Sequence, residues 1–288
     1  MREITVELNF ADEIIITAII ENTVNKSGFY AEHGLSILLE IISQDGTTKI
    51  LLDTGQSTFA FMHNAQRLKI ELTDIDAIVI SHGHYDHTGA LLNILKKIPK
   101  QTPVIGHPNM FDKKYSTHPR LRYIGVPFSK DDLEHIGILT LTRTPIKVAP
   151  SACTTGEINR TSYSPLSNKL LIKKNETLVK DELFDDQALI VNTKEGIVII
   201  AGCAHSGIVN TIFHAQKLAN RKEVIGVIGG FHLVESAPEI IEATLEVLKT
   251  LSLKVLAPCH CSGFVAQKIF SDNLEGFKLF NTGTSLKL

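Results

Sequence analysis

The feature that most constrains this chain is a histidine-rich segment that directly follows an apolar stretch. Residues 76–80 read Asp-Ala-Ile-Val-Ile, and residues 81–87 read Ser-His-Gly-His-Tyr-Asp-His. A short run of β-branched apolar residues predicts a buried strand. A tight turn after that strand can direct several polar side chains into one cavity, and Gly83 gives the turn its backbone freedom. The chain must therefore fold so that a buried strand ends at a polar site.

Four side chains of this segment are of types that bind metal ions: His82, His84, Asp86 and His87. Imidazole nitrogens suit zinc, iron or manganese, and a carboxylate adds a hard oxygen ligand. The first two histidines can point one way while Asp86 and His87 take a second direction. The turn can therefore hold two ions, which lie roughly 3.5–4 Å apart in two-metal hydrolytic sites. A surface loop that is rich in histidine by chance is the alternative, and it does not account for the apolar strand.

The remainder of the chain contains strands and helices in two similar series. In the first half, predicted strands cover residues 4–10, 14–20, 35–42, 49–52 and 76–80. In the second half, they cover residues 187–192, 196–201, 224–228 and 254–257, with helices near 208–218 and 238–251. Two such halves packed sheet against sheet, with helices outside, form an α+β protein of four layers, an αββα sandwich.

The length of 288 residues suits one large domain, and we expect residues 1–288 to form it. Residues from about 109 to 165 are rich in Pro, Ser, Thr and Arg and lack a clear period. Long irregular segments in compact domains are often functional, so we expect a lid or substrate region there. Residues 185–187, Asp-Asp-Gln, are expected to form a solvated strand entry, with a place in the cavity as the alternative.

The charge balance and the composition of the chain argue against nucleic-acid and membrane partners. The 29 basic and 31 acidic side chains give a net charge of -2, whereas a protein that binds nucleic acid non-specifically usually has a basic excess. No apolar run reaches the roughly 20 residues that span a bilayer, and the first ten residues lack the pattern of a signal peptide. We therefore expect a cytoplasmic protein with a small-molecule substrate and with no nucleic-acid or membrane partner. The oligomeric state stays open. The four cysteines are too few for a disulfide scaffold in a chain this long.

The histidine segment resembles the signature of the metallo-β-lactamase superfamily. Leu51-Leu52-Asp53-Thr54-Gly55 is similar to the early part of that signature, in which the aspartate supports the metal loop. Residues 82–89, 202–210, 229–233 and 258–263 together resemble a prokaryotic subgroup of metal-dependent hydrolases. This subgroup includes synthases that join a dihydropterin diphosphate to an aryl ribotide with loss of diphosphate. The resemblance implies the metallo-β-lactamase fold with one or two divalent ions, zinc as the first choice and manganese or iron as alternatives.

Three later histidines share one context, an apolar strand followed by small residues: His205, His232 and His260. His260 resembles the last metal ligand of the superfamily, and we place it on a second ion with Asp86 and His87. A catalytic zinc usually takes three protein ligands, so His205 is predicted to join His82 and His84 on the first ion. His232 is predicted to be a proton donor, with metal ligation or substrate contact as alternatives.

The chain departs from the superfamily at the position of the bridging aspartate, where Gly202 and Cys203 stand. The usual segment with the third histidine is replaced by Thr-Thr-Gly-Glu at residues 154–157. Cys203 is predicted to be a buried thiol near the metals, with thiolate ligation as the alternative. Tyr85, inside the metal turn, is predicted to contact substrate or to pack. The number of bound ions, one or two, therefore stays open.

These residues predict a metal-dependent enzyme that acts on a small phosphorylated substrate, by hydrolysis or by dihydropterin transfer. Asp86 would orient the attacking group on the second ion, and His232 would act as a general acid. A nuclease is a second enzymatic candidate, which the balanced charge disfavours. A metal-binding sensor or binding protein without turnover is the alternative from another class, and the missing bridging aspartate is its best support.

Overall fold

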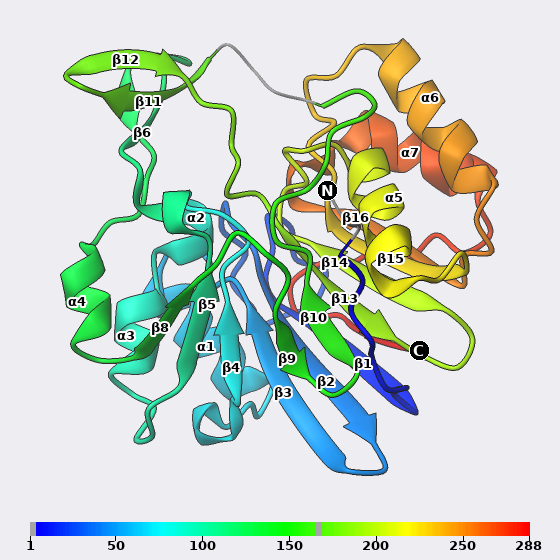
Figure 1. Cartoon of the computed structure of the whole chain (residues 1–288), viewed down its shortest axis with the longest axis horizontal. Coiled ribbons are helices and arrows are strands. Elements are labelled where there is room, and N and C mark those ends of the chain that lie inside the picture. The colour runs from blue at the N-terminus through cyan, green and yellow to red at the C-terminus, as the bar shows by residue number, and fades with distance from the viewer. Residues whose placement is uncertain (1–3, 165–168) are drawn as a thin grey trace.

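Two β-sheets lie face to face in the middle of the molecule, with helices on their outer sides (Figure 1). The computed structural model describes residues 4–164 and 169–288. The first sheet has seven strands in the order β17-β1-β2-β3-β4-β5-β8, and the second has six in the order β16-β15-β14-β13-β10-β9. This arrangement confirms the predicted α+β protein with an αββα sandwich.

The first sheet consists of β1 (Glu13–Ile20), β2 (Ser36–Ser43), β3 (Gly46–Leu52), β4 (Ala77–Val79), β5 (Pro103–Gly106), β8 (Ile138–Leu141) and β17 (Ser285–Lys287). The second consists of β9 (Lys147–Ala149), β10 (Ala152–Thr154), β13 (Ala188–Asn192), β14 (Ile197–Ala201), β15 (Val224–Gly230) and β16 (Val255–Cys259). A third, small sheet contains β12 (Thr177–Lys180), β11 (Leu170–Lys174), β6 (Lys114–Ser116) and β7 (Arg122–Tyr123).

The helices are α1 (Thr58–Arg67), α2 (Tyr85–Thr88), α3 (Leu91–Leu95), α4 (Lys130–Glu134), α5 (Ile208–Ala219), α6 (Pro238–Lys249) and α7 (Phe264–Asn273). In Figure 1, α1 and α3 lie on the side of the first sheet, and α5, α6 and α7 lie on the side of the second. Within the described parts of the chain, no helix is both long enough and apolar enough to cross a membrane.

The facing sides of the two sheets share one apolar core. Ile14 and Ile16 of β1 belong to the same buried cluster as Val198 and Ile200 of β14. This spacing of two residues follows from the strand, in which alternate side chains point to the same face. Separate buried clusters join each sheet to the helices that cover it.

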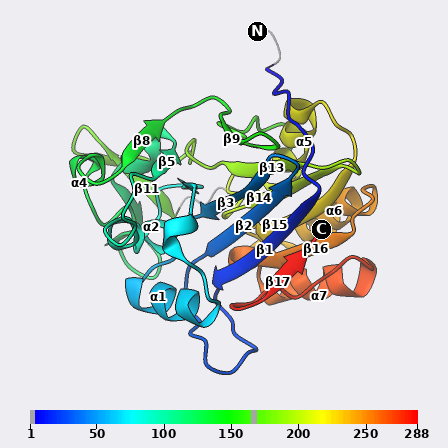
Figure 2. The same ribbon diagram turned by 90° about the horizontal axis from the view of Figure 1, so that it is seen from below.

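Two segments differ from the sequence-based expectation. Residues 4–10 do not form a strand; Val6 donates its backbone N–H to the carbonyl of Leu218 at 2.8 Å, and Val6 and Leu8 pack against the helical side of the second sheet. The alternation therefore reflects the partial burial of Val6 and Leu8 rather than sheet pairing, whereas Ile4 and Phe10 are exposed. The last strand, β17, pairs antiparallel with β1 (Figure 2), so the two sheets are not built from separate halves of the chain.

The segment 109–165 was expected to be irregular; its residues 109–164 contain several short strands and α4, and residue 165 lies outside the described residues. Strand β8 completes one edge of the first sheet, and β9 and β10 complete the second. Strands β6 and β7 belong to the small sheet, which stands apart from the two main sheets near α2 in Figure 1. The role of this region as a lid or substrate region remains a prediction.

Strand direction determines where the polar loops meet. β3, β4 and β5 run parallel in the first sheet, and β14, β15 and β16 run parallel in the second. In parallel α/β arrangements, ligands bind outside the carboxyl ends of the strands. The segments after β3, β4, β14, β15 and β16 carry every side chain that the sequence assigned to the site.

Candidate metal centre

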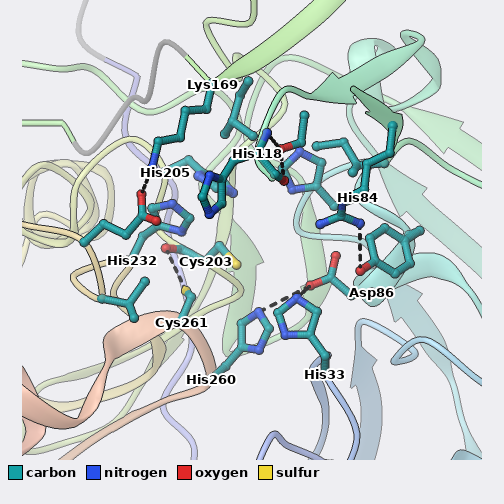
Figure 3. A pocket seen from close by; sticks show the side chains of 17 residues that line it. His33, His84, Asp86, His118, Lys169, Cys203, His205, His232, His260 and Cys261 are labelled. Atoms are coloured by element: carbon teal, nitrogen blue, oxygen red, sulfur yellow. Dashed lines mark hydrogen bonds and ion pairs between the residues drawn. The ribbon is translucent and has the colours of Figure 1, made fainter. Parts of the chain in front are cut away.

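Histidine, aspartate and cysteine side chains from five strand ends converge on one site (Figure 3). All of them are buried except for the half-buried His232. The loop after β3 supplies Asp53, and the loop after β4 supplies His82 and His84. Helix α2, which follows that loop, supplies Asp86 and His87. The segments after β14, β15 and β16 supply Cys203, His205, His232 and His260. The structure thus brings the predicted residues together, whereas their roles as ligands remain predictions.

The first group contains His82, His84 and His205. Nε2 of His82 lies 2.9 Å from Nδ1 of His84. The ring of His205 lies 4.8 Å from that of His82 and 5.2 Å from that of His84, centroid to centroid. Neither ring nitrogen of His205, nor Nε2 of His84, has a hydrogen-bond partner among the described residues. Buried polar atoms without a partner need an explanation, and a metal ion that binds these lone pairs provides one.

The second group contains Asp86, His87 and His260. The Nε2 atoms of His87 and His260 lie 3.2 Å apart, and Oδ2 of Asp86 lies 3.7 Å from the first and 3.6 Å from the second. On its other side, the His260 ring contacts Asn22 through Nδ1, 2.8 Å from Oδ1. His33 reaches the same carboxylate, with Nε2 3.2 Å from Oδ2 of Asp86. Two nitrogens and a carboxylate oxygen at these distances can bind one ion.

Cys203 lies between the two groups. Its Sγ is 3.2 Å from Nε2 of His87. Its ligand atom also lies within 4.8 Å of those of His82 and His205, of His87 and His260, and of His232 and Cys261. Imidazole with thiolate is a combination that suits zinc and iron, whereas the second group with its carboxylate suits zinc, iron or manganese. The donor set therefore fits the divalent ions that the sequence predicts.

One carboxylate orients histidines of both groups. Oδ1 of Asp53 accepts the backbone N–H of Ser81 at 2.8 Å, and Oδ2 accepts the Ser81 hydroxyl at 2.6 Å. The same Oδ2 lies 2.6 Å from Nδ1 of His87, and the Ser81 hydroxyl lies 2.9 Å from Nδ1 of His82. Carboxylate partners of this kind fix the ring orientation and tautomer of metal-binding histidines. Asp53 therefore has the supporting position that was expected for it.

The backbone of the site is locally strained. Asp53, Ala204, His232 and His260 have φ angles of 58°, 49°, 49° and 51°, in the left-handed region that non-glycine residues seldom adopt. Such conformations persist only where the surrounding structure enforces them, and they concentrate at functional sites.

Burial lowers the pKa values of the histidines at this site, whereas neighbouring carboxylates raise them. Burial lowers the pKa of His84 to about 3 and that of His260 to about 4, so these rings are neutral near pH 7 and have a lone pair for a metal. Burial would also lower the pKa of His87, but the carboxylates of Asp53 and Asp86 outweigh it and raise that pKa to about 9. A metal at Nε2 of His87 must therefore displace a proton.

A buried ion-pair cluster beneath the metal loop was not predicted. Oδ2 of Asp185 accepts the backbone N–H of Gly83 at 2.8 Å. Oδ1 of Asp185 and Oδ2 of Asp181 each lie 2.9 Å from Nζ of Lys114, which is only 1% exposed. The expected solvated entry at residues 185–187 is wrong, since all three residues are buried. The acidic pair Asp185-Asp186 directly before a buried strand could have indicated a buried charge. Its partner on β6, Lys114, could not be identified from the sequence.

A cavity of about 270 Å³ opens onto the metal centre. It is lined by His84, Asp86, Cys203, His205, His232 and His260 together with Ser116, His118, Arg122, Lys169 and Leu170, and Figure 3 shows it from close by. The ring of His232 lies 4.2 Å from that of His205, and its buried Nδ1 has no hydrogen-bond partner among the described residues. Tyr85 also lines the cavity, as the contact role predicted for it requires.

Comparison with known proteins agrees with this geometry. The family model of the metallo-beta-lactamase superfamily matches residues 30–210. A 7,8-dihydropterin-6-methyl-4-(beta-D-ribofuranosyl)-aminobenzene-5'-phosphate synthase from Methanocaldococcus jannaschii is 35% identical over 269 residues, which cover 91% of this chain and 92% of that protein.

Solved structures give the same result. The crystal structure of a metal-dependent hydrolase of the beta-lactamase superfamily superposes with a TM-score of 0.82 at 30% identity, over 96% of this chain and 99% of that one. Zinc-bound PqqB from Methylobacterium extorquens superposes with a TM-score of 0.55 at 10% identity, over 95% of this chain and 100% of that one. The second likeness concerns the fold alone.

Proposed function

The chain belongs to the metallo-β-lactamase superfamily of enzymes, and on that premise we propose that it is a metal-dependent synthase acting on small phosphorylated substrates. The proposed reaction joins a dihydropterin diphosphate to an aryl ribotide phosphate. The observation that carries the proposal is the cavity, which is lined by buried metal-binding side chains together with cationic side chains. The likeness to the archaeal synthase, which extends over 91% of the chain, supports the choice of substrates.

In this proposal, His82, His84 and His205 hold one divalent ion, and Asp86, His87 and His260 hold a second; zinc is the first choice. A divalent ion at these positions polarises a diphosphate leaving group or activates a water molecule. Ring nitrogens of His84 and His205 are buried without a hydrogen-bond partner among the described residues, which supports the assignment of these histidines to the first ion. The proximity of the Asp86 oxygen to both ring nitrogens of the second group supports the other.

We include Cys203 among the residues that would hold the ions, where it would supply a thiolate sulfur. Burial raises the pKa of its thiol in the metal-free protein, and a divalent ion deprotonates a thiol that coordinates it. The position of Sγ within reach of both histidine groups supports this assignment. It replaces the sequence-based preference for a thiol that only packs.

The remaining residues orient the reacting groups and move protons. The reaction forms a bond between the pterin methylene carbon and the amine nitrogen of the acceptor, breaks the carbon–oxygen bond to diphosphate, and releases one amine proton. His232, beside His205 on the cavity wall, is placed to donate a proton to the departing diphosphate. Asp86 is placed to hold the second ion against the same group. A location in the cytoplasm and a lack of nucleic-acid partners remain predictions from the sequence.

The test is to supply both substrates to protein loaded with zinc, manganese or ferrous iron and to measure diphosphate release together with the coupled product. We expect release that requires the acceptor, equals the product formed, and is lost after chelation or in His82→Ala. Release without acceptor would favour hydrolysis, which the likeness to a metal-dependent hydrolase makes the second candidate. No release, together with no turnover of phosphodiesters or lactones, would refute both and favour the sensor.

A further inference from the structure

Part of the wall of the cavity at the metal centre is built by a separate element. Strands β6, β7, β11 and β12 form the small sheet, which stands apart from the two main sheets (Figure 1). This sheet and the residues beside its strands contribute Ser116, His118, Arg122, Ile124, Lys169 and Leu170 to the cavity. The metal centre and the small sheet therefore line the same cavity.

Two contacts fix the small sheet to the metal-binding segment. Tyr85 donates its backbone N–H to the carbonyl of Ile124 at 2.9 Å, directly after β7. Lys114 on β6 pairs with Asp185, whose second oxygen holds the backbone N–H of Gly83. Both contacts end on residues 83–85 and so connect the small sheet to the segment that carries the predicted metal ligands.

Arg122 is the cation that this arrangement leaves available. Its guanidinium lies over the ring of Tyr85, 5.8 Å from the centroid, and one N–H donates to the Tyr85 hydroxyl at 3.4 Å. Among the described residues, no carboxylate lies within ion-pair distance of it, whereas Arg143 pairs with Glu157 and Arg221 with Glu223. Lys169, on the same wall, already pairs with Glu235 at 2.8 Å. Stacking on the tyrosine orients the guanidinium while most of its donors stay unused.

We propose that Arg122, with His118 beside it on the wall, binds a phosphate monoester of the substrate. A planar guanidinium matches a phosphate group through two parallel hydrogen bonds. This inference rests on the proposed function for the identity of the ligand, which is then the 5'-phosphate of the aryl ribotide. That phosphate is not broken in the reaction, so it has to lie away from the metals, where the diphosphate leaves. Arg122 belongs to the part of the wall that the small sheet contributes, and none of the predicted metal ligands lies on that sheet.

The test uses Arg122→Met and a matched control, Arg120→Met. Arg120 lies two residues earlier, is exposed and does not line the cavity. Ribose 5-phosphate is the probe, titrated calorimetrically into metal-loaded protein, with ribose as the uncharged comparison. We expect the dissociation constant to rise about tenfold or more in Arg122→Met, as the loss of a charge-assisted hydrogen bond implies. It should stay within twofold in Arg120→Met, with unchanged metal content and circular dichroism in both.

Failure of the subsite and failure of the reaction are distinguishable. Equal affinity of Arg122→Met and the unaltered protein for ribose 5-phosphate would overturn the subsite, even if diphosphate release were found. Arg122-dependent binding without any diphosphate release would support the subsite and refute the synthase reaction. Where turnover is found, Arg122→Met should raise the KM for the ribotide about tenfold and leave kcat within twofold. A fall in kcat at constant KM would contradict a binding role.

Discussion

Replacement of Asp53 by asparagine isolates what one buried carboxylate contributes to the metal centre. The side chain is fully buried and contacts Ser81 twice and His87 once, at 2.6–2.8 Å. Its φ of 58° lies in the left-handed region, which asparagine tolerates as well as aspartate does. The substitution therefore changes charge and hydrogen bonding without adding backbone strain, as alanine would.

The expected effect follows from the tautomer of His87. An amide can still accept the backbone N–H of Ser81, but it presents a donor where Oδ2 accepted from the Ser81 hydroxyl and faced Nδ1 of His87. To meet that donor, the ring would have to carry its proton on Nε2, the atom that faces His260. Loss of such a carboxylate partner typically weakens metal binding about 10–100-fold, or roughly 1.4–2.8 kcal/mol. We expect this loss at the ion held by His87.

Proton competition gives the effect a pH dependence. Because the Asp53 charge helps to raise the pKa of His87 to about 9, a proton competes with the metal below that pH in the unaltered protein. In the variant, a proton competes less strongly with the metal for His87. This gain partly offsets the variant's loss of metal affinity near pH 7. The difference in affinity between the two proteins should therefore widen as the pH rises from 7 to 9.

The assay is zinc competition against a chromogenic chelator at both pH values, with circular dichroism as a check on folding. Asp76→Asn is the matched control, because Asp76 is exposed and its contacts lie away from the histidines: it accepts the backbone N–H of Lys49 at 2.8 Å and pairs with Nζ of Lys100 at 3.7 Å. Zinc affinity of Asp53→Asn within twofold of the unaltered protein at pH 9 would refute the reasoning.

Four further substitutions have defined outcomes. His260→Ala should lower the metal content by one equivalent in elemental analysis, and loss of both equivalents or of neither would contradict the division of ligands. Cys203→Ser should abolish the sulfur-to-metal charge-transfer absorption of the cobalt-loaded protein; an unchanged band would assign the sulfur to another cysteine. Lys114→Met leaves two buried carboxylates unpaired and should lower the free energy of unfolding by about 3–5 kcal/mol in urea titrations, and a loss below about 1 kcal/mol would speak against a buried pair. Gly89→Ala has a permissive φ of -61°, but its Cβ would clash with the carbonyl oxygen of Gln56, so metal content should fall; full occupancy would show that the turn adapts.

Local patterns in the sequence determined most of the strands and identified residues 82–87 as the candidate metal-binding segment. The apolar runs at 14–20, 35–42 and 224–228 lie within β1, β2 and β15, apart from one residue before β2. These features are encoded within a few consecutive residues, because strand period and metal-ligand spacing are short-range properties. Strand-end histidines were found for the same reason, since each follows its own buried strand.

The tertiary structure alone decided how distant segments meet. Thr17 of β1 contacts Ser285 of β17 at 2.9 Å across 268 positions of the chain, and Asp185 holds Gly83 across 102 positions. The central place of Cys203 arises in the same way, because it depends on loops from both sheets closing around one point. Each of these contacts depends on the packing of the whole sandwich, and no period or spacing along the chain encodes it, so these features could be identified only in the folded structure.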